Sequence, residues 1–222
     1  AQERLCESLE ENNVVNEDSD APQLVTVILD KTSFYGESGG QVGDIGWLEG
    51  PQGTFEVLKT QKEGGFFLHC GVLRSGLIEL GQEVSAMVDE RRRKAIRRAH
   101  SATHLVHAAL QHFLGTHAVQ QGSKVDADLL RFDFSHASAV DHETLLQVET
   151  MVNENVLAAA PVAASLLPLE EARHAGAMML FGEKYPDIVR MVSIDGISRE
   201  LCGGTHVTNT GEIGLVKITN EE

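Results

Sequence analysis

The sequence predicts an α+β protein, with a small β-barrel subdomain over residues 22–89 and an α/β sandwich over residues 90–222. Two observations carry this prediction. Before residue 90, short runs rich in β-branched and aromatic residues alternate with glycine-containing turns, which is typical of a small antiparallel barrel or sandwich. After residue 90, long segments with helical spacing of apolar residues alternate with short strands, which is typical of helices packed on a sheet.

Composition narrows the class of protein. The 222 residues are 42% hydrophobic and 23% charged, as in globular proteins, and the net charge of −15 argues against a general nucleic-acid coat protein. No apolar run reaches the roughly 18 residues of a membrane span, and no signal peptide is visible. Three cysteines at unrelated spacings indicate no disulfide framework. We therefore expect a cytoplasmic protein without a membrane partner and, because the chain starts with Ala1, an excised or processed fragment.

The first part of the chain is predicted to contain strands around one long loop. Residues 1–21 are polar and acidic, which favours a linker or a frayed helix. Strands are predicted at 24–30, 54–60, 66–73 and 83–89. The loop 32–46 has five glycines and no helical period. Its glycines would let a ligand approach the backbone, and its hydroxyl and amide groups could bind a small polar substrate. The alternative is an ordinary loop of the barrel.

The second part is predicted to begin with a long helix. Asp89 is a suitable N-cap, residues 90–114 contain neither Gly nor Pro, and Gly115 would end the helix. The further elements are a strand at 130–135, a helix at 141–160 ended by Pro161, a strand at 162–168, a short helix at 169–177, and strands at 187–194 and 213–219.

Two short motifs each place two metal-binding side chains four positions apart. His100 and His104 share one face of the predicted helix, and glycines between Cys202 and His206 allow a tight turn that brings both inward. One cysteine and three histidines suit tetrahedral zinc. The pairs are too far apart in the chain for a local zinc finger, and His107 competes because it shares the helix face of His100. One alternative is a zinc site that is filled by four protein ligands and has only a structural role. The other is that the two pairs do not bind a common ion.

Basic residues gather at the start of the same predicted helix. Six of the 18 Lys and Arg residues are Arg91, Arg92, Arg93, Lys94, Arg97 and Arg98. Such a local stripe on an acidic protein could contact one phosphate backbone, and the alternative is an ordinary solvated helix face.

Six segments, in order, resemble one known family. TSFYGESGGQVGDIG, RRAHSATHLVHAAL, QQGSKV, LRFDFSH, MLFGEKY and ELCGGTHVTNTGEIGLVKI resemble the editing domain of alanyl-tRNA synthetase over about residues 24–219. Free-standing alanyl-tRNA editing proteins and, more distantly, the editing domain of threonyl-tRNA synthetase share part of this pattern. The resemblance implies a fold of this editing-domain type, hydrolysis of the ester between serine or glycine and the 3′ end of alanine tRNA, and attachment to the remainder of the synthetase chain.

The resemblance also implies roles for individual residues. Zinc is expected on His100, His104, Cys202 and His206, which leaves His107 as a packing residue. The catalytic pocket is expected to contain Thr32, Gln41, Gln120 and Cys202, with Thr32 recognising the serine hydroxyl and Gly39 and Gly40 lining the pocket. The basic stripe of Arg91, Arg92, Arg93, Lys94, Arg97 and Arg98 is expected to contact the acceptor stem and 3′ end of the tRNA.

Physical chemistry agrees with a pocket that recognises the serine hydroxyl. Serine is larger than alanine, so a site that removes serine cannot exclude alanine by size and must demand the hydroxyl. Two questions stay open at this point. Four protein ligands would fill a tetrahedral zinc, so the ion would either activate water or only position the substrate. The same residues also fit a free-standing editing protein, or a tRNA-binding module whose zinc is purely structural.

Overall fold

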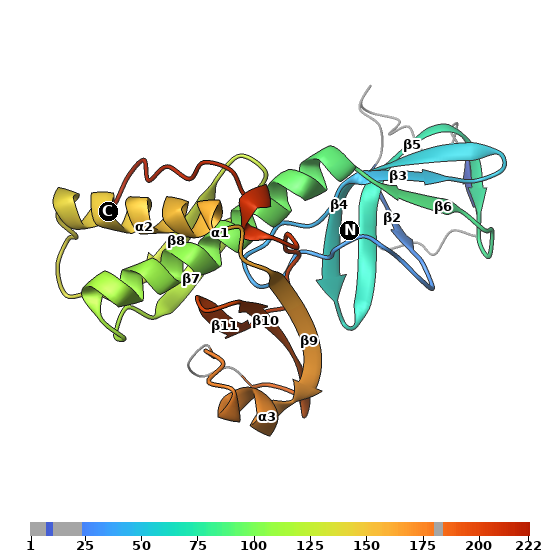
Figure 1. Cartoon of the computed structure of the whole chain (residues 1–222). Helices are drawn as coiled ribbons and strands as arrows, with labels where there is room; N and C mark the ends of the chain where they lie inside the picture. Colours follow the sequence, from blue (N-terminus) through green and yellow to red (C-terminus); the bar gives the residue numbers. More distant parts are fainter. Residues whose placement is uncertain (1–7, 11–23, 180–183) are drawn as a thin grey trace. The chain divides into compact units, whose positions relative to one another are not determined.

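The computed structural model describes residues 8–10, 24–179 and 184–222. The chain forms two compact units, one of Ala1–Ser38 with Val42–Arg93 and the other of Gly39–Gln41 with Lys94–Glu222. Both contain antiparallel sheets, and helices occur from residue 90 onward, so the predicted mixture of helices and sheets is confirmed (Figure 1). None of the helices in the described ranges is long and apolar enough to span a bilayer.

The first unit contains one antiparallel sheet. Its strands are β1 (Ser8–Glu10), β2 (Val25–Ile28), β3 (Gly46–Glu49), β4 (Gly53–Glu63), β5 (Phe66–Glu79) and β6 (Ser85–Val88). They lie in the order β1-β5-β4-β3-β6, and β2 also pairs with β5. Successive side chains of β4 point to opposite faces of the sheet. Phe55 and Val57 therefore pack into a core, while Glu56 points away from it. The other core residues are Phe34, Leu48, Leu73 and Ile78.

The predicted barrel is wrong, because the described strands form an open sheet. A barrel closes only when its first and last strands pair, but β6 pairs with β3, and β1 and β2 both pair with β5. The 14 residues of β5 are long enough to hold β2 at one end, where Val25 opposes Gly71, and β1 at the other, where Ser8 opposes Glu79. Ser8–Glu10 is thus a strand and no linker or helix; the rest of the 1–21 prediction lies outside the described residues.

Helix α1 (Glu90–Leu114) has the predicted bounds. The carboxylate of Asp89 accepts a hydrogen bond from the backbone N–H of Arg92 at 2.9 Å, as an N-cap does. Gly115 follows the last turn with φ of +106°, a left-handed conformation that glycine adopts without strain. Local sequence signals therefore determine where this helix begins and ends.

The core of the second unit lies between α1 and α2 (His142–Leu157), which run side by side in Figure 1. Leu105 and Ala109 of α1 pack with Val148 and Val152 of α2, and all four side chains are buried. The remaining elements are the hairpin of β7 (Gln120–Val125) and β8 (Leu130–Phe134), α3 (Leu169–His174), η2 (Thr210–Glu212), and a sheet in the order β11-β10-β9 formed by Ser198–Leu201, Ile188–Ile194 and Val162–Pro168.

Four predictions about this unit need correction. Helix α2 ends at Leu157 and not at 160, α3 ends at His174 and not at 177, and β7 and β11 occur where no strand was predicted. The predicted strand 213–219 is absent, because side chains of α2 bind its backbone in place of a neighbouring strand. Asn153 exchanges two hydrogen bonds of 2.9 Å with the backbone of Val216, and Glu149 accepts one of 2.7 Å from the N–H of Ile218.

Candidate metal centre

Helix α1 and the turn after β11 bring four metal-binding side chains together. The donor atoms of His100, His104, Cys202 and His206 all lie within 4.8 Å of one another. The rings of His100 and His104 are stacked 5.6 Å apart on successive turns of α1, as the i, i+4 spacing predicts. The three histidines are buried, and the group could hold a metal ion.

Backbone contacts hold the turn that carries Cys202. The N–H of Cys202 donates to the carbonyl of Arg190 on β10, and the Arg190 guanidinium donates to the carbonyl of Cys202 at 2.7 Å. Gly204 passes so close to His100 that a Cβ atom there would overlap the imidazole, whereas a Cβ on Gly203 would meet nothing within 4 Å. The two glycines of the motif are therefore not equivalent, and Gly204 is the one that permits the approach.

Hydrogen bonds orient the rings so that their Nε2 atoms face the centre of the group. His100 Nδ1 donates to Gln41 Oε1 at 2.7 Å, and His104 Nδ1 donates to Glu200 Oε2 at 2.9 Å. His206 Nδ1 lies 3.3 Å from the hydroxyl of Ser101. These partners are typical of metal-binding histidines, whose second nitrogen is usually held by a carboxylate or another oxygen.

The free donor atoms also fit a metal. The Nε2 atoms of His100 and His206 lie 3.4 and 3.3 Å from Cys202 Sγ. His104 Nε2 is buried and has no hydrogen-bond partner among the described residues. A buried nitrogen without a partner is costly in a folded protein, and a metal bond at the centre of the group would satisfy it.

Electrostatics favour the metal-binding form of the cysteine. Burial disfavours the thiolate of Cys202, but the neighbouring His100, His104 and His206 side chains outweigh burial and hold the pKa of the thiol far below its usual value. Burial lowers the pKa of His206 to about 4, so this ring is neutral at pH 7. Both residues are thus ready to bind a cation without losing a proton.

Glu200 is a buried site residue that the sequence analysis missed. Burial disfavours its charge, but His104 holds the pKa of the carboxyl below its usual range, and Glu200 in turn raises the pKa of His104 to about 10 against the effect of burial. Glu200 also accepts from the Ser198 hydroxyl at 2.8 Å and lies 3.3 Å from His107 Nδ1. The signal in the sequence was an acidic residue two positions before Cys202, and the structure places it at an inward position of β11.

The Gly39–Gln41 turn belongs to the same unit and contacts the centre. Gln41 is fully buried, and its Oε1 accepts hydrogen bonds from His100 and from the N–H and hydroxyl of Thr205. The carbonyl of Gly40 accepts from Val125 at 2.8 Å, which attaches the turn to β7. The Gln41 Nε2 atom is buried and has no hydrogen-bond partner in the described part of the chain.

Comparisons with known proteins point to one family. Residues 2–92 match the family described as tRNA synthetases class II (A), and residues 189–222 match the threonyl and alanyl tRNA synthetase second additional domain. The alanine–tRNA ligase of Methylobacillus flagellatus is 54% identical over 200 residues, and that of Dichelobacter nodosus is 52% identical over 201 residues. This chain belongs to the alanyl-tRNA synthetase family. These alignments cover 90% of the chain but 23% of each relative, so the chain spans about a quarter of the relatives' length and matches the editing-domain region of the synthetase.

The other residues expected from the alanyl-tRNA synthetase resemblance lie as follows. Gln120 is half-buried on β7, where its amide donates to the Ser123 hydroxyl at 3.1 Å. Thr32 belongs to the first unit and lies 2.8 Å from His69 Nε2. Their roles in a synthetase editing pocket stay predictions. His107 lies outside the four-residue group and contacts Gln111, 3.2 Å away, as well as Glu200.

The basic stripe of this synthetase region divides into anchored and exposed residues. In the first unit, Arg92 donates to the carbonyl of Gly43, and Arg93 forms an ion pair with the buried Asp44. In the second unit, Arg97 donates to the carbonyl of His206. The exposed members of the stripe are Arg91, Lys94 and Arg98. Half of the stripe therefore holds loops in place, and contact with tRNA remains a prediction.

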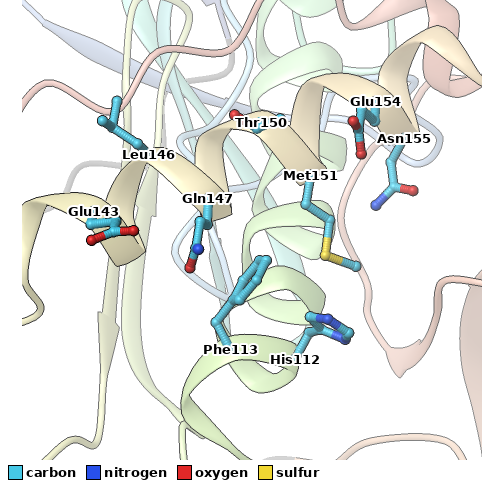
Figure 2. A pocket seen from close by; sticks show the side chains of 9 residues that line it. All are labelled: His112, Phe113, Glu143, Leu146, Gln147, Thr150, Met151, Glu154 and Asn155. Carbon is cyan, nitrogen blue, oxygen red and sulfur yellow. The ribbon is translucent and has the colours of Figure 1, made fainter.

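A groove lies elsewhere in the second unit, between the end of α1 and α2. Figure 2 shows the side chains of Phe113 and Met151 entering it from the two helices. Its other lining residues are His112, Glu143, Leu146, Gln147, Thr150, Glu154 and Asn155. The groove contains none of the residues expected in the synthetase editing site.

Proposed function

We propose that this chain is the editing part of an alanyl-tRNA synthetase and hydrolyses the ester that joins serine or glycine to the 3′ end of alanine tRNA. The observation that carries the proposal is the group of His100, His104, Cys202 and His206, in which the three histidines are buried and their rings face one centre. The six ordered motifs and the match to the alanine–tRNA ligases support the same reaction.

The reaction needs water and a stable position for the ester. The oxygen of water forms a bond to the ester carbonyl carbon, and the bond from that carbon to the ribose oxygen breaks. The amino acid leaves as a free acid, and the ribose hydroxyl recovers a proton. Negative charge develops on the carbonyl oxygen during this step, and donors fixed in advance stabilise it best.

Zinc is the metal that we propose for the centre, because thiolate and imidazole are its usual ligands. A zinc ion held by these four residues would supply a positive, Lewis-acidic centre for the ester. The residues around the ion would hold its ligands in position. Gln41 and Glu200 fix the tautomers of His100 and His104, and Arg190 fixes the backbone of Cys202.

Selection against serine requires a group that pairs with its hydroxyl. We assign this role to Thr32, because a polar group left unpaired by alanine discriminates more strongly than the volume of one atom. Gly39 and Gly40 are proposed to line the pocket, and Gln41 and Gln120 to support it. The unpaired amide nitrogen of Gln41 is a donor available for this purpose.

Alanine tRNA is the proposed partner, recognised through its acceptor stem and 3′ end. The chain has a net charge of −15, so phosphate contacts must be local. The exposed Arg91, Lys94 and Arg98 are the candidates on the basic stripe. The remainder of the synthetase chain is the second proposed partner, and the cytoplasm is the proposed location.

Two alternatives remain in view. A free-standing editing protein would perform the same chemistry. A tRNA-binding module with a purely structural zinc is favoured by one observation, namely that four protein ligands would fill a tetrahedral ion.

A deacylation assay separates an enzyme from a binding module. The zinc-loaded chain is mixed with alanine tRNA that carries labelled serine, and the release of serine and the binding of tRNA are both measured. Release above the spontaneous rate supports the enzyme. Binding without release, in a chain with stoichiometric zinc, would establish the structural alternative.

A further inference from the structure

Thr32 and His69 form a chain of hydrogen bonds inside the first unit. Thr32 Oγ1 lies 2.8 Å from His69 Nε2, and His69 Nδ1 lies 3.0 Å from the carbonyl oxygen of Val27 on the neighbouring strand β2. His69 is fully buried and packs edge-on against Phe34, with the ring centres 5.2 Å apart. The imidazole is therefore held in one orientation by contacts on both nitrogens and by the ring of Phe34.

The carbonyl of Val27 decides the tautomer of His69. A carbonyl oxygen only accepts hydrogen bonds, so Nδ1 must carry a proton. Burial lowers the pKa of His69, and the hydrogen bond to Val27 opposes this only in part, so the neutral ring is favoured. In a neutral ring with its proton on Nδ1, Nε2 is an acceptor. The hydroxyl of Thr32 must then donate its single proton to His69.

A second contact uses one lone pair of the same hydroxyl. The backbone N–H of Phe34 donates to Thr32 Oγ1 at 3.1 Å. A hydroxyl has one proton and two lone pairs, so one lone pair of Thr32 is left for another partner. Thr32 is half-buried, so the core encloses its side chain only in part.

We propose that His69 is a positioning residue that makes Thr32 a hydrogen-bond acceptor toward the ligand. The ligand must then offer a donor, as the hydroxyl of serine does, whereas the methyl group of alanine and the hydrogen of glycine cannot. A threonine with a freely rotating hydroxyl would also bind acceptor groups, and His69 removes that freedom. The inference rests on the proposed function, in which Thr32 reads the serine side chain.

The first test needs no activity. The chain is labelled with ¹⁵N-histidine, and the ring signals of His69 are identified by their loss in His69→Gln. At pH 7 we expect a protonated Nδ1 and an unprotonated Nε2. A ring protonated on Nε2, alone or together with Nδ1, would overturn the proposal, because Thr32 would then keep its proton for the ligand.

The second test compares hydrolysis of seryl and glycyl esters of alanine tRNA by the 222-residue chain. His69→Leu removes the acceptor, and we expect the preference for the seryl ester to fall by about two- to tenfold, the usual size of one hydrogen bond. His69→Gln should restore most of the preference, because its amide can accept from Thr32 and donate to Val27. Thr54→Val, which removes a half-buried hydroxyl bonded to Ser75 in the same sheet, is the control.

The outcomes are distinguishable. An unchanged ratio in a folded His69→Leu variant, or an equal loss on both esters, would overturn the role of His69; thermal unfolding followed by circular dichroism reports whether that variant is folded. If the unaltered chain hydrolyses neither ester, the proposed function fails. The tautomer measurement still decides whether the Thr32 hydroxyl donates its proton to His69.

Discussion

Glu200 accepts a hydrogen bond from His104, with Oε2 of the carboxylate 2.9 Å from Nδ1 of the imidazole. Both side chains are buried, and no turn or helix spacing in the sequence joins them. Once the ring is neutral, this bond keeps the proton on Nδ1 and leaves the lone pair on Nε2, the atom that faces Cys202 and His206. It also puts a negative charge next to the position where a cation would bind, which partly balances the charge of that cation.

Glu200→Gln should therefore weaken metal binding without unfolding the chain. The amide keeps the size of the side chain but loses the charge, and losses of about 10–100-fold in metal affinity are usual when such a partner is changed. Competition with a chromophoric chelator measures the affinity. Glu171→Gln, an exposed residue of α3, is the matched control. Equal affinity in Glu200→Gln and Glu171→Gln would show that Glu200 does not position His104.

Cys202→Ala should abolish ester hydrolysis and weaken zinc retention. The change removes the one thiolate of the group and leaves three imidazoles, a weaker set for zinc. Zinc content after dialysis and the rate of serine release are the two measurements. Cys70→Ala, which removes a half-buried thiol of the first unit, should leave both unchanged. Normal turnover by zinc-free Cys202→Ala would disprove the assignment of the metal.

The two glycines of the turn should respond differently to alanine. Gly204→Ala places a methyl group against the His100 ring, so the turn or the ring must move. We expect a loss of about 1–3 kcal/mol in the free energy of unfolding, the usual cost of overpacking, together with weaker metal binding. Gly203→Ala meets nothing within 4 Å and should cost much less. Chemical denaturation of both variants tests this, and equal destabilisation would contradict the close approach at Gly204.

Metal binding at pH 7 should displace a proton from His104. Its pKa is raised to about 10 in the metal-free chain, so the ring is charged at pH 7, whereas a metal needs a neutral nitrogen. Cys202 and His206 have lowered pKa values and release nothing further. Affinity should therefore increase as the pH rises from 7 toward 10. Calorimetry in buffers of different ionisation enthalpy counts the protons. Glu200→Gln should release fewer, and a heat independent of buffer would refute the prediction.

Exposed residues of the basic stripe should control the salt dependence of tRNA binding. If Arg98 contacts a phosphate, Arg98→Gln weakens binding and reduces the slope of log affinity against log salt by about 1. Arg91→Gln should act in the same way. Arg173→Gln, on the exposed side of α3, is the control of equal charge. Slopes equal to that of the control would mean that the stripe is only a solvated helix face.

Sequence by itself determined the features that depend on neighbours in the chain. Asp89 and Gly115 set the ends of α1 through a cap and a left-handed residue, and the i, i+4 spacing put His100 and His104 on one face. The spacing of Cys202 and His206 identified the second half of the group, and ordered motifs identified the family. These signals are local, so a single sequence carries them.

Tertiary structure alone decided the features that depend on distant partners. Gln41 and Glu200 orient the histidines through hydrogen bonds to residues far away in the sequence, and only the place of Glu200 two residues before Cys202 hinted at its role. Residues 213–219 have the composition of a strand, but Asn153 and Glu149 satisfy their backbone with side-chain groups. The first sheet stays open because β1 and β2 both pair with β5, and β6 pairs with neither of them. Strand composition predicts extended backbone, whereas the choice of hydrogen-bond partner depends on which groups folding brings within reach.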